Sequence, residues 1–112
     1  MKSRNLFESI KFAFDGICYT FRNERNFRIH LIISILVIIL GLILKLDYIE
    51  FLVIFLCIGL VLFAEIINTS IESVVNLIVE DEYKKFAKIA KDTAAGAVLV
   101  TAIITAVIGS VI

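Results

Sequence analysis

Hydrophobic residues dominate three long stretches of the chain, and each is long enough to cross a bilayer as a helix. They cover residues 29–46, 48–79 and 93–112. The third stretch carries no charged residue and would be about 30 Å long as a helix, which matches the hydrocarbon core of a bilayer. The second is longer than a bilayer needs and is expected to project on one side. The pattern predicts an all-α integral membrane protein with three spans.

Residues 4–22 show a different pattern, in which apolar and charged residues alternate with the helical period. The apolar side carries Leu6, Phe7, Ile10, Ala13, Phe14, Ile17, Cys18 and Phe21, and the polar side carries Glu8, Lys11, Asp15 and Arg22. This pattern is typical of an amphipathic helix that lies in the membrane interface. A helix that packs on the other helices is compatible with the same pattern.

Composition supports a membrane protein of one domain, residues 1–112. Of the 112 residues, 61% are hydrophobic, whereas a soluble domain has about 45–50%. The 11 basic and 11 acidic residues give no net charge, so nucleic acid is not expected as a partner. His30 is the sole histidine, which argues against a conventional zinc site.

The distribution of lysine and arginine predicts how the chain is oriented. Lys2, Arg4, Lys11, Arg22, Arg25 and Arg28 precede the first span, and Lys84, Lys85, Lys88 and Lys91 lie between the second and third spans. Only Lys45, at the end of the first span, lies near the connection between the first and second spans. By the positive-inside rule, the N-terminus and the loop at residues 80–92 face the cytoplasm, and the C-terminus faces outward. We therefore expect a multi-pass protein of the cell membrane.

A polar stripe interrupts the second span. At 100° per residue, an arc of roughly 80° on one helix face contains Glu65, Asn68, Glu72 and Asn76. A carboxylate at the centre of a bilayer costs about 2.5–3.5 kcal/mol, so two of them on one stripe mark a functional site. In the predicted orientation this site is reachable from the cytoplasm.

Other interpretations of these residues remain open at this point. Glu65 can be a protonated group that donates a hydrogen bond between helices, and Asn68 can join helices in the same way. Near the membrane surface, Glu24, Lys91 and Asp92 can each be solvated charges.

The charged residues nevertheless suggest one chemistry, because they are expected to meet at one membrane level. Glu24 and Glu72 offer the oxygen ligands that suit Mg²⁺ bound together with phosphates. Three cationic side chains could neutralise those phosphates: Lys91, Arg22 and Arg28. Glu65 beside Asn68 could accept a proton from a lipid hydroxyl. The pattern predicts phosphoryl transfer from a cytosolic nucleotide, and the absence of a GxxxxGK[ST] motif excludes a P-loop.

Three segments in this order resemble the prokaryotic diacylglycerol kinase family of small three-span lipid kinases. They are residues 22–28 (RNERNFR), 65–72 (EIINTSIE) and 87–98 (AKIAKDTAAGAV). The first and third are similar to the Gram-positive branch, whose members are mainly undecaprenol kinases. The resemblance covers nearly the whole chain.

The resemblance implies a homotrimer with active sites at subunit boundaries, and Mg²⁺ with ATP as the co-substrate. It makes Glu65 the catalytic carboxylate. The residues expected to bind the lipid head are Asn68, Lys91 and Asp92. Those expected to bind the nucleotide are Glu24, Glu72 and Lys91, together with Arg22 and Arg28. Glu24 and Glu72 correspond to the metal-binding carboxylates.

Two positions depart from the family pattern. Asn76 stands where the family usually has an aspartate, so no metal role is expected of it. His30 occupies a position that is acidic in some diacylglycerol-specific relatives, which favours undecaprenol as the acceptor. We therefore expect an undecaprenol kinase. The alternatives are a diacylglycerol kinase that makes phosphatidic acid and, in another class, a small oligomeric channel or ion-coupled carrier.

Overall fold

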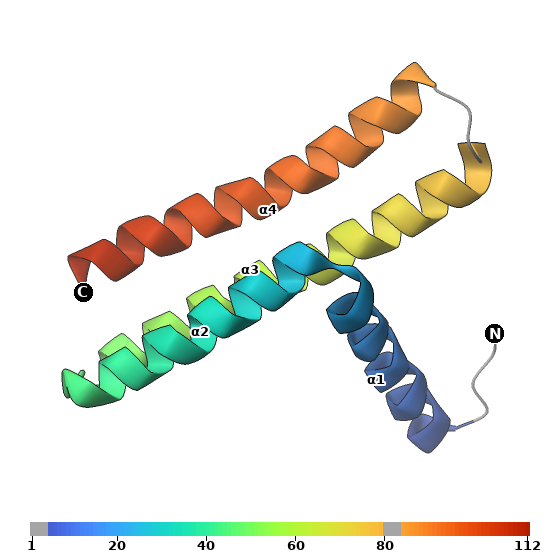
Figure 1. Ribbon diagram of the computed structural model, residues 1–112. Coiled ribbons are helices and arrows are strands. Elements are labelled where there is room, and N and C mark those ends of the chain that lie inside the picture. Colours follow the sequence, from blue (N-terminus) through green and yellow to red (C-terminus); the bar gives the residue numbers. More distant parts are fainter. Residues whose placement is uncertain (1–4, 80–83) are drawn as a thin grey trace.

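The computed structural model describes residues 5–79 and 84–112, which form four helices (Figure 1). They are α1 (Leu6–Asn23), α2 (Arg25–Ile43), α3 (Tyr48–Val79) and α4 (Lys85–Val111). Helices α2, α3 and α4 run alongside one another, and α1 turns away from them (Figure 1). The all-α prediction is confirmed. The predicted start of the first helix at residue 4 lies outside the described residues, as do residues 80–83 of the expected cytoplasmic loop.

The junction between α1 and α2 consists of one extended residue, Glu24, with φ −111° and ψ 108°. At the other end of α1, the Asn5 side chain caps the helix by accepting a hydrogen bond from the Glu8 backbone N–H at 2.9 Å. Arg28 secures the junction, because its Nη1 donates to the carbonyl oxygens of Phe21 and Arg22 at 2.8 and 2.9 Å. These carbonyls belong to the last turn of α1, where a cation is favourable.

A tight turn joins α2 to α3 at the opposite end of the molecule. Lys45 has φ 57°, and the next backbone N–H, that of Leu46, donates to the Gly41 carbonyl at 3.1 Å. Asp47 and Glu50 cap α3 reciprocally, since each backbone N–H donates to the other carboxylate at 3.0 and 2.9 Å. These bonds close the chain into an antiparallel α2–α3 pair.

Helix α3 is central, with its most extensive packing on α4 and a smaller contact on α2. The buried apolar residues on α3 and α4 are Ile54, Cys57, Val61, Ala94 and Val98. Most large apolar side chains of α2, α3 and α4 remain exposed. All three helices are long and apolar enough to cross a membrane, which confirms the prediction of three spans and indicates a multi-pass membrane protein.

Helix α1 also leaves its apolar side exposed, with Phe7 78% and Phe14 63% exposed. Such a face fits the membrane interface, but the location of α1 in the interface stays a prediction. The same holds for the homotrimer, which the single chain does not test.

Candidate functional site

The polar stripe of α3 is buried at its start, whereas Glu72 is partly exposed and Asn76 is exposed. Glu65 is 1% exposed and Asn68 8% exposed, whereas the apolar residues Ile67 and Leu77 of the same helix are 42% and 79% exposed. This arrangement is the inverse of that in a soluble helix and suits a span surrounded by lipid. The sequence periodicity predicted that these residues share one face, and the packing of the helices buries this face at Glu65 and Asn68 but not at Asn76.

The side chains of the stripe are only partly satisfied by hydrogen bonds. Asn68 Nδ2 donates to Glu72 Oε1 at 3.0 Å, and Thr69 Oγ1 donates to the Glu65 backbone carbonyl at 3.0 Å. Two buried acceptors, Glu65 Oε1 and Asn68 Oδ1, have no hydrogen-bond partner among the described residues. Each such atom costs about 1–3 kcal/mol. The site therefore presents two acceptor oxygens, three residues apart on one helix, that lack a donor.

A side chain of α2 lies close to the Glu65 carboxylate. His30 Nε2 lies 3.4 Å from Glu65 Oε1. From the sequence, His30 stands out only as a lone histidine and as a departure from a family pattern, so its contact with Glu65 was not predicted. Residue counts could have indicated it, because His30 and Glu65 lie about 20 and 26 Å along their helices from the turn that joins α2 to α3.

Glu24 is brought to the same region by the α1–α2 junction. Its pKa is raised above the ordinary value by burial and by the charge of Glu72, while the nearby Arg28 opposes the shift. Glu24 and Glu72, which lie far apart in the sequence, are therefore electrostatic neighbours. Glu24 also acts on Glu65, so three carboxylates share one end of the bundle.

These carboxylates suit a magnesium ion that is bound partly by the protein and partly by the phosphates of a substrate. No group of three or more His, Cys, Asp or Glu side chains in residues 5–79 and 84–112 could hold a metal ion. Mg²⁺ does not need such a group, since it is commonly bound by one or two carboxylates plus substrate phosphates and water. Glu24 and Glu72 are carboxylates of the kind that this ion takes, and their role as its ligands stays a prediction.

The two predicted arginines, Arg28 and Arg22, differ in their relation to the carboxylates. Arg28 acts on Glu24, but its Nη1 also holds the end of α1. Arg22 lines a separate cavity between α1 and the other helices, together with Cys18 and Phe21. For both residues a contact with nucleotide stays a prediction.

Lys91 and Asp92 lie near the start of α4. Asp92 accepts a hydrogen bond from Lys88, one turn earlier on the same helix. In the part of the chain that the structure describes, no hydrogen bond or ion pair joins Lys91 or Asp92 to the three carboxylates. Within one chain, therefore, no such contact brings Lys91 and Asp92 to the carboxylates, where the sequence predicted them to lie.

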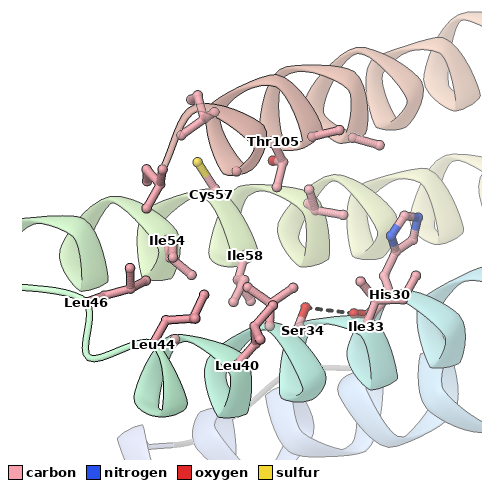
Figure 2. A pocket seen from close by; sticks show the side chains of 18 residues that line it. His30, Ile33, Ser34, Leu40, Leu44, Leu46, Ile54, Cys57, Ile58 and Thr105 are labelled. Carbon is pink, nitrogen blue, oxygen red and sulfur yellow. Dashed lines mark hydrogen bonds between the residues drawn. The ribbon is translucent and has the colours of Figure 1, made fainter.

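An apolar cavity of about 430 Å³ extends from the site between α2, α3 and α4. Figure 2 shows Leu44, Leu46 and Ile54 at one end and His30 at the other. The Ser34 hydroxyl in its wall donates to the His30 backbone carbonyl at 2.7 Å, so it is already satisfied. His30 thus lies between the apolar cavity and the carboxylates.

Comparison with known proteins gives consistent matches. Residues 11–112 match a family model described as prokaryotic diacylglycerol kinase. A diacylglycerol kinase of Synechocystis sp. is 45% identical over 105 residues, which cover 94% of this chain and 60% of that protein. An undecaprenol kinase of Bacillus subtilis is 45% identical over 106 residues, which cover 95% of this chain and 85% of that protein. This chain therefore spans less than two thirds of the Synechocystis relative, and the two identities do not distinguish between the lipids.

Proposed function

This chain belongs to the prokaryotic diacylglycerol kinase family, and from that premise we propose that it is an ATP-dependent lipid kinase whose acceptor is undecaprenol. The product is undecaprenyl phosphate. Two features support undecaprenol over diacylglycerol. His30 replaces an acidic residue of some diacylglycerol-specific relatives, and the chain spans more of the Bacillus relative than of the Synechocystis relative.

The observation that carries the proposal is the pair of buried acceptors on α3. Glu65 Oε1 and Asn68 Oδ1 lack hydrogen-bond donors among the described residues. Both belong to α3, a helix that is apolar enough to cross a membrane. A lipid alcohol in the bilayer offers the missing donor, because its hydroxyl group is the polar end of an otherwise apolar molecule. The stripe is therefore suited to receive that hydroxyl group.

In the proposed reaction, Glu65 accepts the hydroxyl proton while the lipid oxygen bonds to the γ-phosphorus of ATP. The bond between this phosphorus and the ADP oxygen breaks, and the proton later leaves Glu65 for solvent. Asn68 orients the acceptor and, through Nδ2, holds Glu72. Such a transfer depends mainly on positioning and on the neutralisation of charge.

Glu24 and Glu72 would hold Mg²⁺, which when bound neutralises charge on the ATP phosphates. Lys91, Arg22 and Arg28 are proposed to contact the nucleotide, and Lys91 and Asp92 to contact the lipid head. Since no contact of Lys91 or Asp92 with the carboxylates is seen within one chain, we propose that a neighbouring subunit completes each site. A homotrimer with its N-terminus in the cytoplasm would place all these groups on the side where ATP is available.

The experiment that tests the proposal is phosphate transfer from labelled ATP by purified protein in mixed micelles. Undecaprenol and diacylglycerol are offered in separate and in competing reactions, each with Mg²⁺ and with chelator. We expect metal-dependent transfer with a higher kcat/KM for undecaprenol.

Each other result has a defined meaning. A higher kcat/KM for diacylglycerol would replace the proposed acceptor by the other lipid named in the family. Transfer to neither lipid by folded protein would contradict the kinase proposal. Ion flux through liposomes without ATP would then favour the channel or carrier alternative.

A further inference from the structure

One contact between two polar side chains joins different helices at the site, within the part of the chain that the structure describes. His30 of α2 places Nε2 at 3.4 Å from Oε1 of Glu65 on α3. The Glu65 side chain is 2% exposed, and the His30 side chain is 26% exposed. The imidazole is therefore the more accessible member of a pair whose other member is closed off from its surroundings.

The imidazole also separates the Glu65 carboxylate from the apolar cavity. His30 lines this cavity, whereas Glu65 is not among its lining residues. Figure 2 shows the His30 ring directed toward α3 at the end of the cavity. The ring position thus affects which side of the carboxylate can receive a substrate.

Other polar groups near Glu65 do not supply a donor to its carboxylate. The Thr69 hydroxyl donates to the Glu65 backbone carbonyl, and the amide of Asn68 donates to Glu72. Glu24 and Glu72 are of like charge to Glu65. Among the described residues, His30 is the group within reach of Oε1 that can donate a hydrogen bond.

We infer that His30 is a positioning residue for Glu65. Its Nε2–H approaches one lone pair of Oε1 and holds the carboxylate in one orientation, which leaves the second lone pair of Oε1 to receive the acceptor hydroxyl. The 3.4 Å separation is long for a hydrogen bond, and catalytic hydrogen bonds commonly shorten when substrate binds. The inference rests on the proposed function, in which Glu65 is the base.

The test replaces the imidazole and measures lipid phosphorylation by the assembled protein. We expect His30→Leu to lower kcat by about 10- to 100-fold, because a misplacement of about 1 Å in a catalytic group can cost ~10²-fold. The KM values for ATP and lipid should change by less than about two-fold, since the group acts on turnover rather than on binding. His30→Gln, whose side-chain amide can donate from a similar position, should recover most of the lost kcat.

Ile33→Leu is the matched control, because Ile33 lies one turn further along α2, lines the same cavity and has no polar group. It should retain wild-type kcat. Each variant is checked for oligomeric state and thermal unfolding in detergent. If His30→Leu does not assemble, His30→Ala takes its place, since it removes the donor without adding volume.

A double-mutant cycle with Glu65→Gln shows whether His30 acts through Glu65. In the Glu65→Gln background, the residual kcat should not fall further on His30→Leu. Wild-type kcat in His30→Leu would overturn the inference, as would equal losses in the Leu and Gln variants with a raised KM for lipid. Wild-type protein that phosphorylates no lipid would instead refute the proposed function, and the inference with it.

Discussion

The two halves of α3 differ in what they bury. The first half buries apolar residues, Ile54, Cys57 and Val61, against α2 and α4. The second half buries Glu65, Asn68 and Thr69, and two of their oxygen atoms have no donor among the described residues. Both halves belong to one continuous helix, Tyr48–Val79. The comparison indicates that the first half stabilises the bundle, whereas the second half carries the proposed site at a cost in stability.

The largest expected effect comes from removing the charge at the boundary between the halves. Glu65→Gln should lower kcat by about 10²- to 10⁴-fold, the usual contribution of a general base, while assembly is retained because the amide has nearly the same volume. Turnover is measured with Mg-ATP and undecaprenol, and the fold by thermal unfolding in detergent.

The matched control is Glu50→Gln in the first half of α3. Its side chain caps the helix through the Asp47 backbone N–H, and the amide oxygen of glutamine can accept the same hydrogen bond. Its kcat should equal that of the wild type. Equal loss of kcat in both variants, or full activity in Glu65→Gln, would remove the functional distinction between the halves.

Glu24→Gln should lower activity by an intermediate factor, whereas it should raise the stability of the folded chain. Loss of one proposed metal ligand should weaken Mg²⁺ activation by about 10- to 100-fold, measured as the Mg²⁺ concentration for half-maximal turnover. Burial and the charge of Glu72 raise the pKa of Glu24 above its ordinary value of 4.5. Ionisation of Glu24 therefore destabilises the folded chain in the absence of metal.

The sign of the pH dependence follows from this shift. The destabilisation is fully present above the raised pKa of Glu24 and disappears below its ordinary value, so acidification relieves it. At pH 7 without Mg²⁺, Glu24→Gln should unfold at a higher temperature than the wild type, and this difference should shrink as the pH is lowered toward 4.5. A lower unfolding temperature for Glu24→Gln at pH 7 would contradict the like-charge pairing of Glu24 with Glu72.

The smallest effect on turnover is expected from a change on α2 that faces the apolar half of α3. A Cβ on Gly41 would meet Leu46 Cδ1 and Phe51 Cε1, each at 3.1 Å, so Gly41→Val crowds the turn between α2 and α3. We expect a loss of about 1–3 kcal/mol in unfolding free energy, with kcat per folded molecule unchanged. Gly109→Val is the control, because a Cβ there meets no heavy atom within 4 Å. A large fall in kcat for Gly41→Val would show that the halves are coupled.

Hydropathy was sufficient to predict the helices of this protein. Residues 51–64, for example, contain no charged residue over the length of a helix. Such a segment forms a helix in a bilayer because the bilayer permits only structures that satisfy their own backbone hydrogen bonds. The stripe of Glu65, Asn68 and Glu72 could be predicted too, because helical period alone sets which residues share a face. The ends of the helices were less accessible to prediction, since α4 begins at Lys85, in the charged segment before the apolar run.

The contacts between helices could not be read from any single segment. The sequence by itself determined the number of spans, the polar stripe and the family motifs, because periodicity and composition are local properties. The tertiary structure brings Glu24 within the electrostatic influence of Glu72, as the sequence predicted, and it alone shows that His30 reaches Glu65. These pairs depend on the extended residue at the α1–α2 junction and on the turn between α2 and α3, which together set the register of one helix against the next.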